Sequence, residues 1–170
     1  GSGTAHAQAK VPAPKRIVSL NLCADQLLVA LADRDQIAGL TRNAVDPEMS
    51  AAAVGAKGLP LLGGSAEAVM AAKPDLLIGM PARRNSAISV LKEGKFKTVD
   101  LKTAKSYDDI LVSIRTVASA VGHPARGEAL IQRMNADLAR LPKASRGYVG
   151  AYYQRRGFLT GGGTLIDDLM

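Results

Sequence analysis

The chain has 170 residues, of which 47% are apolar and 22% are charged, and its 22 Lys and Arg against 15 Asp and Glu give a net charge of +7. This length suits one domain with a substantial core, and the composition excludes a collagenous, disulfide-rich or wholly disordered chain. No stretch reaches the roughly 18 consecutive apolar residues that a membrane-spanning helix needs. Positive charge would suit nucleic acid, but single-strand binding needs aromatic side chains among the basic ones, and the four Tyr and two Phe are scattered. Nucleic acid is therefore not an expected partner.

The amino-terminal residues 1–15 are predicted to form a loose tail, because they are small, polar and contain proline. Residues 1–3 (GSG) resemble a cloning remnant. Residues 5–7 (AHA) fit the small-x-small pattern around a signal-peptidase cut, which indicates export, although alanine-rich chains also contain this pattern by chance. The single cysteine, Cys23, excludes an intramolecular disulfide and a cysteine-cluster metal site.

Strands and helices are predicted to alternate along most of the chain. Short β-branched or apolar runs predict strands at 16–20, 36–40, 76–78, 97–101 and 147–153. Apolar spacing predicts a helix after the first strand, with Leu27, Leu28 and Leu31 on one face, and further helices at 85–93 and 124–141. Capping residues predict three more helices. These run from an N-cap at Ser65 to Ala72, from a Ser106–Asp109 capping box to Val121, and from a Thr164–Asp167 capping box. Residues 41–49 are predicted to be a loop.

This alternation predicts an α/β fold with a doubly wound, mostly parallel sheet. Ligands of such sheets bind beyond the carboxyl ends of the strands, which directs attention to the loops at 21–25, 41–47, 80–85 and 102–105. The two successive helices before residue 147 break the alternation. The second of them would be roughly 27 Å long, enough to carry the chain out of one domain and into another.

Four phrases in the sequence resemble one protein family in their order and spacing. They are RIVSLNLCADQLLVALADRDQIAGLT, SAEAVMAAKPDLLIG, SYDDILVSIRTVASAVGHPARGEALIQRM and GGGTLIDDLM. Together they resemble the periplasmic substrate-binding proteins of iron-siderophore, haem and cobalamin importers. The resemblance implies two Rossmann-like α/β lobes joined by a long backbone helix, with the ligand held between them. On this division the first lobe spans 16–122, the interlobe helix 123–142, and the start of a truncated second lobe 143–170.

The resemblance also implies a docking residue for the membrane permease. In the family, a glutamate on the outer face of each lobe docks into arginine pockets of the permease, and Glu67 occupies the matching place here. The alternative interpretation is that Glu67 only complements the dipole of a helix whose first turn contains it.

Because the family's ligands are metal chelates, many of them anionic, the expected ligand-binding residues are basic or planar. A guanidinium can form two parallel hydrogen bonds to the paired oxygens of a carboxylate or catecholate. The alternative interpretation is that arginines in these loops are only solvated. The predicted ligand-binding residues are Asn21, Arg42, Arg83, Arg84, Tyr152, Tyr153, Arg155 and Arg156. Tyr152 and Tyr153 are adjacent on a predicted strand, so only one of them can face the cleft.

The remaining motifs give weaker indications of function. Cys23 at a helix start could have a lowered pKa, but a small buried side chain is the commoner role of a lone cysteine. His6 in the tail and His123 before Pro124 predict neither a metal site nor a catalytic triad. Glycines 161–163 lack both phosphate-loop patterns and predict a turn.

The sequence therefore predicts the solute-binding component of an ATP-binding-cassette importer, with a ferric siderophore preferred as cargo and cobalamin or haem as alternatives. It predicts no enzyme activity, no resident metal and no cofactor. A nucleotide- or cofactor-using α/β enzyme domain stays open as the second class, and an interaction module as the third. A homodimer formed through the truncated second lobe is expected, because an unpaired strand edge at 147–153 would seek another chain.

Overall fold

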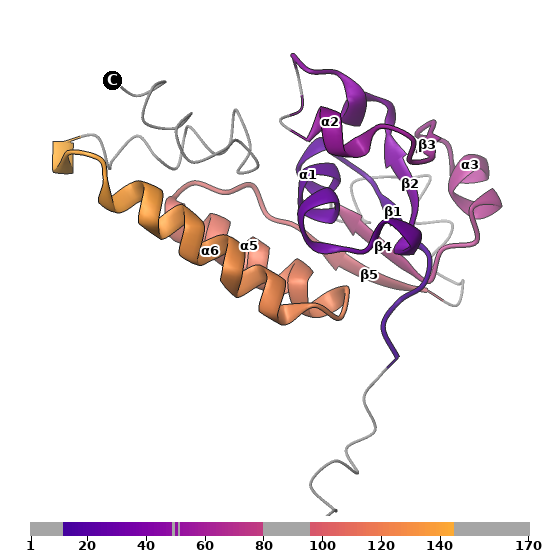
Figure 1. Cartoon of the computed structure of the whole chain (residues 1–170). Coiled ribbons are helices and arrows are strands. Elements are labelled where there is room, and N and C mark those ends of the chain that lie inside the picture. Colours follow the sequence, from indigo (N-terminus) through magenta and orange to yellow (C-terminus); the bar gives the residue numbers. More distant parts are fainter. Residues whose placement is uncertain (1–11, 49, 51, 80–95, 145–170) are drawn as a thin grey trace, which may run out of the picture.

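The structure, a computed structural model, describes residues 12–48, 50, 52–79 and 96–144 (Figure 1). Its centre is one sheet of five strands in the order β3-β2-β1-β4-β5, and every neighbouring pair is parallel. The strands are β1 Ile17–Ser19, β2 Ile37–Thr41, β3 Leu61–Leu62, β4 Leu76–Gly79 and β5 Lys97–Asp100. This order reverses at β1 and so confirms the predicted doubly wound α/β fold.

The helices of the described residues lie on both faces of this sheet and beyond it (Figure 1). They are α1 Leu22–Leu31, α2 Ala53–Ala56, α3 Ala66–Ala71, α5 Tyr107–Ala120 and α6 Pro124–Ala139, with short 3-10 turns η2 Arg34–Gln36 and η3 Arg42–Val45. None of the helices in these ranges is both long and apolar enough to cross a membrane. The helix predicted at 85–93, the strand at 147–153, the helix from Thr164 and the second lobe lie outside the described residues.

Neighbouring residues of the central strands face opposite sides of the sheet. Ile17 and Ile78 belong to the larger core with α1, α5 and α6, whereas Val18 and Leu77 belong to a smaller core with Val69 of α3. Because both faces are covered, β1 and β4 are buried throughout and their sequences are apolar runs without polar alternation.

The edge strand β3 is held by close packing against β2. The register between β1 and β2 shifts after Ile17: Ile17 lies opposite Ile37, but Val18 lies opposite Gly39. One extra residue of β2 is therefore accommodated at this point. A β carbon at Gly39 would overlap the side chain of Leu62 in β3, so a larger residue there would force Leu62 to move. The sequence pattern predicts neither β3 nor α2. The segment 41–49, which is predicted to be a loop, contains the 3-10 turn η3.

The start of β1 is clamped by the turn that precedes β4. The Asp75 carboxylate accepts the backbone N–H groups of Lys15 at 2.7 Å and Arg16 at 3.0 Å. The Arg16 Nε donates to the carbonyl of Ala72 at 2.7 Å. The carbonyl of Pro14 accepts a hydrogen bond from Gln36. The last residues of the predicted loose tail are therefore hydrogen-bonded to the lobe, because the Asp75 carboxylate satisfies two otherwise unpaired donors.

Helices α5 and α6 form an antiparallel pair, and α6 begins beside the lobe and runs away from it (Figure 1). The pair packs closely because Gly127 has no side chain: a β carbon there would lie 2.6 Å from that of Ala118. Ser106 caps α5 by accepting the Asp109 N–H, as predicted. The Asp109 carboxylate, however, accepts the N–H of Lys105, so the reciprocal half of the predicted capping box is replaced by a bond one residue earlier.

The amino end of α6 is fixed to the lobe by a cluster around Asp33. Its carboxylate pairs with Arg126 at 2.6 Å and lies 3.2 Å from His123 Nε2. Gln36, buried below, donates to the carbonyl of Val121 and lies 3.1 Å from the same imidazole nitrogen. His123 occupies the N-cap position of α6, but its side chain makes no cap bond and instead contacts Asp33 and Gln36.

Candidate functional site

The carboxyl ends of all five parallel strands meet at one edge of the sheet, where ligands of doubly wound folds bind. Within the described residues, the segments that leave this edge are 20–21, 42–48, 63–65 and 101–106. Two predicted ligand-binding residues, Asn21 and Arg42, lie on them. The other six (Arg83, Arg84, Tyr152, Tyr153, Arg155 and Arg156) lie outside the described residues.

Asn21 caps the first helix with its side chain. It has extended backbone angles, and its Oδ1 accepts the N–H of Ala24 at 2.9 Å. Ser19, the last residue of β1, donates its hydroxyl to the Asn21 carbonyl at 2.8 Å. These bonds fix the carboxamide at the sheet edge, and its Nδ2 makes no hydrogen bond with any other described residue. Asn21 therefore offers donor hydrogens at the place where a ligand is expected.

Behind Asn21, a buried carboxylate joins the first helix to the second strand. Asp25 is fully buried, and it accepts both the N–H of Thr41, at 2.9 Å, and the Thr41 hydroxyl. Burial raises the pKa of Asp25 above its ordinary value, while the hydrogen bonds from Ser19 and Thr41 act in the opposite direction. The sequence analysis did not single out Asp25 as a partner of Thr41, because nothing in the local pattern links residues sixteen positions apart.

Arg42 follows Thr41 directly and is exposed. Its Nη2 lies 3.7 Å from the point that a β carbon on Gly63 would occupy, so its guanidinium reaches across the turn that follows β3. Arg42 forms no ion pair with any described acidic residue. An unpaired guanidinium at the sheet edge can bind paired oxygens of an anionic ligand.

The only cysteine, Cys23, is exposed at the start of α1. Desolvation by the surrounding protein, followed by the nearby Asp25 carboxylate, raises the pKa of its thiol. The two interpretations offered by the sequence, a reactive thiol of lowered pKa and a small buried side chain, are therefore both wrong. A raised pKa disfavours the thiolate, which is the form of cysteine that reacts as a nucleophile and binds metal ions.

Glu67 lies in the first turn of α3 and is exposed, as docking requires. Ser65 caps the helix by accepting the N–H of Ala68 at 3.1 Å. One turn further along, Met70 is 61% exposed. Helix α3 lies on the face of the sheet opposite α1, at the outside of the lobe (Figure 1).

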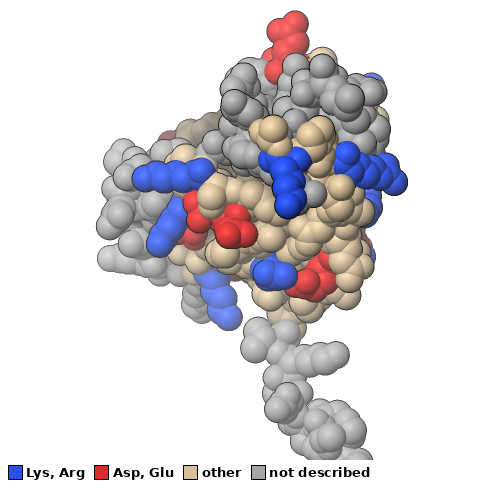
Figure 2. Space-filling model, turned by 90° about the vertical axis from the view of Figure 1, so that its left-hand side faces the viewer, with Lys and Arg blue, Asp and Glu red and all other residues tan. Residues whose placement is uncertain are grey.

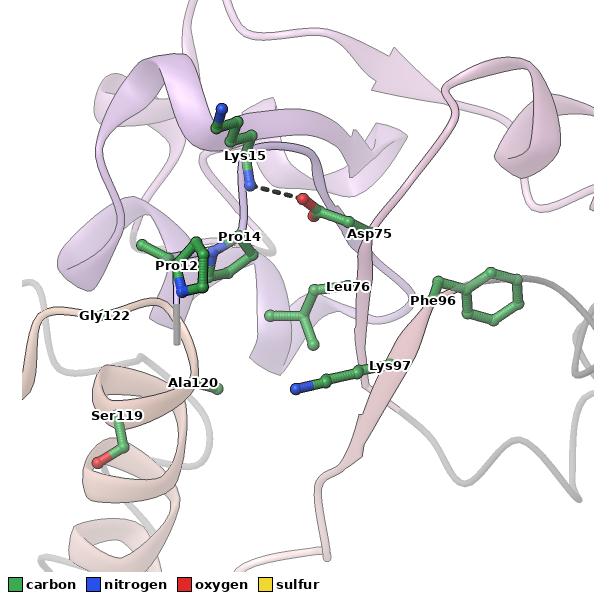
Figure 3. A pocket seen from close by; sticks show the side chains of 11 residues that line it. Pro12, Pro14, Lys15, Asp75, Leu76, Phe96, Lys97, Ser119, Ala120 and Gly122 are labelled. Carbon is green, nitrogen blue, oxygen red and sulfur yellow. Dashed lines mark hydrogen bonds between the residues drawn. The ribbon is translucent and has the colours of Figure 1, made fainter. Parts of the chain in front are cut away.

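A pocket of about 610 Å³ lies at the opposite, amino-terminal edge of the sheet (Figure 3). It is bounded by Pro12, Pro14, Leu76 and Ala120, among others, and the amine of Lys97 points into it whereas the Phe96 ring points away. This pocket adjoins the Asp75 clamp and contains none of the predicted ligand-binding residues. Ligands of doubly wound sheets bind at the other edge, beyond the carboxyl ends of the strands.

The described charged side chains are dispersed on the face of the molecule shown in Figure 2. On the face shown in Figure 2, the Lys and Arg side chains of the described residues are interspersed with Asp and Glu and do not form one continuous patch. Within the described residues, no three His, Cys, Asp or Glu side chains gather as metal ligands do. The part of the chain that the structure describes therefore offers hydrogen-bond donors and a cation at its carboxyl edge.

These features define a ligand-binding α/β lobe: a parallel sheet that reverses at β1, polar groups at its carboxyl edge, and a long helix leading out of the lobe. A sequence profile of the family described as Periplasmic binding protein matches residues 17–169, and the chain belongs to this family. This is a family of binding proteins and not of enzymes.

The individual relatives that match this chain have low sequence identity to it. A cobalamin-binding protein of Halobacterium salinarum is 27% identical over 132 residues, which cover 77% of this chain and 36% of that protein. An uncharacterized ABC transporter substrate-binding lipoprotein of Bacillus subtilis, YvrC, is 25% identical over 78% of this chain and 42% of its own length. The periplasmic haem-binding protein RhuT of Roseiflexus sp. RS-1 is 28% identical, with a TM-score of 0.58 over 74% of this chain and 48% of that structure. The chain thus spans less than half the length of each of these relatives.

Proposed function

We propose that this chain is the first lobe of an exported solute-binding protein that captures a metal chelate for an ATP-binding-cassette importer. The observation that carries the proposal is the arrangement at the carboxyl edge. There the Asn21 amide is fixed by its cap bond to Ala24, and Arg42 follows Thr41, whose N–H and hydroxyl donate to Asp25. Donors and a cation in this arrangement suit a ligand that carries carboxylate, phosphate or amide oxygens.

The cargo we propose is a tetrapyrrole chelate, either cobalamin or haem. Support comes from two relatives of more than 25% identity, of which one is named for cobalamin and the other for haem. The ferric siderophore preferred from the sequence depended on several arginines, and of these only Arg42 lies in the described residues. Both tetrapyrroles have polar groups at the ring periphery, which one lobe can bind while a second lobe covers the rest.

Docking to the permease is assigned to Glu67. Its carboxylate is exposed on α3, and the B. subtilis relative is named as a substrate-binding component of an ABC transporter. We infer that the protein works outside the cytoplasm, as the family's description implies and as residues 5–7 suggested.

The proposal is tested by absorbance titration of the full-length gene product against haemin, cyanocobalamin and a ferric catecholate, with ATP and NADH as controls for the enzyme alternative. We expect saturable binding of one tetrapyrrole and none of the nucleotides. Binding of a nucleotide without any chelate would overturn the proposal, and binding of the ferric catecholate alone would correct the cargo.

A further inference from the structure

Burying the carboxylate of Asp25 costs desolvation free energy, and Asp25 has no cationic partner among the described residues. Asp25 has no exposed surface, and none of the ion pairs among the described residues includes it. A buried carboxylate adds little or no net stability even when it is hydrogen-bonded, because its desolvation offsets the bonds that it gains. Its importance therefore lies in the geometry that it fixes.

That geometry concerns Thr41, the last residue of β2. Asp25 accepts both of its donors, the backbone N–H at 2.9 Å and the side-chain hydroxyl. Thr41 occupies the N-cap position of η3 but makes no side-chain cap bond to it, and its hydroxyl donates to Asp25. The direction in which the chain enters η3 is thus set from the first turn of α1.

The residue that this geometry directs is Arg42. It comes directly after Thr41, is exposed, and extends over Gly63 in the turn after β3. Asn21 caps the first turn of α1, which is the turn that contains Asp25. One buried group therefore links the loops that follow β1 and β2, from which the two described ligand-binding candidates project.

We propose that Asp25 is a positioning residue of the ligand cleft, which holds Arg42 in its binding position through the backbone and hydroxyl of Thr41. This rests on the proposed function, because the cleft is defined by it. The alternative is that the Asp25–Thr41 pair only contributes to folding, in which case loss of the hydroxyl would lower stability without changing affinity.

The test replaces the hydroxyl and leaves the shape. Thr41→Val is similar in shape and replaces the hydroxyl by a methyl group, whereas Thr41→Ser keeps the hydroxyl. Thr98→Val on the exposed face of β5 is the matched control. Each variant of the full-length gene product is titrated with haemin and cyanocobalamin at a temperature where circular dichroism shows it fully folded. The Arg42 Nε–Hε resonance of each variant is followed by NMR on the 170-residue chain.

For Thr41→Val we expect at least fivefold weaker binding and a displaced Arg42 resonance, whereas Thr41→Ser and Thr98→Val should match the unmodified protein. Asp25→Asn, which keeps one acceptor oxygen, should fall between Thr41→Val and the unmodified protein. Unchanged affinity and an unchanged Arg42 resonance in folded Thr41→Val would overturn the positioning role while leaving the proposed function intact. If the unmodified protein binds neither chelate, the proposed function fails, and the positioning role falls with it.

Discussion

At the scale of single residues, Asp33 carries much of the anchoring of α6. The Arg126 hydrogen bond, followed by the nearby charges of Arg126 and His123, holds the pKa of Asp33 below its ordinary value of 3.8. A carboxylate whose pKa is lower in the folded state stabilises the fold above its unfolded pKa, and this contribution disappears as the pH falls through the lowered value.

Asp33→Asn should therefore lower the urea midpoint at pH 7, and the difference from the unmodified chain should vanish as the pH falls below 3.8. Asp35→Asn, two residues away, is the control, because Asp35 takes part in none of the ion pairs among the described residues. A midpoint difference that stays constant from pH 7 to acid would show that Asp33 acts through something other than its charge.

Single residues also show where sequence reasoning reached its limit. Asn21 and Arg42 could be selected because strand ends predict which loops gather at the carboxyl edge. The partners of Asp25, Asp33 and Asp75 could not be predicted, because their bonds join segments between 16 and 93 positions apart. Local pattern carries no information about such contacts, which form only when the sheet brings the segments together.

At the scale of elements, the α5–α6 pair depends on close contact at Gly127. In Gly127→Ala the added β carbon would lie 2.6 Å from that of Ala118. Overpacking costs about 1–3 kcal/mol, which outweighs the roughly 1 kcal/mol that alanine gains over glycine in a helix. We expect a net loss of up to about 2 kcal/mol in the free energy of unfolding, measured by urea denaturation.

Two further variants make that measurement specific. Gly127→Ala combined with Ala118→Gly should recover part of the loss, because the second change removes the atom that clashes. Gly64→Ala, where nothing lies within 4 Å of the added atom, should cost little. Equal losses in both single variants would mean that α5 and α6 do not pack as described.

The central strands and the longer helices were predictable from the sequence, whereas β3 and α2 were not. Strands β1, β2, β4 and β5 lie within one residue of their predicted ends. For β1, β2 and β4 the reason is that buried parallel strands have largely apolar sequences, whereas β5 is a mostly exposed edge strand. Strand β3 has two residues and depends on the fit of Leu62 over Gly39, and α2 has four residues, so neither produces a periodic pattern. Helix α6 begins at the predicted Pro124 and ends at Ala139, two residues before the predicted end at Leu141.

At the scale of the whole molecule, the proposed function separates cargo binding from delivery. Glu67→Arg should abolish chelate import in cells that depend on this protein while leaving chelate affinity unchanged, because Glu67 is exposed on α3, which packs on the face of the sheet opposite α1, and is none of the proposed ligand-binding residues. Asp108→Arg is the matched control, since Asp108 is an exposed acidic residue in the first turn of another helix. Normal import by Glu67→Arg would remove Glu67 from the docking surface.

The central claim, that the carboxyl edge is the ligand site, is tested most directly by mapping chelate binding on the 170-residue chain with NMR. Cyanocobalamin and gallium protoporphyrin are suitable probes because both are diamagnetic. We predict that one of them shifts the resonances of Asn21, Thr41 and Arg42 and leaves those of Asp75 and Lys97 unchanged. Shifts confined to Asp75, Lys97 and the pocket at the amino edge would contradict the account.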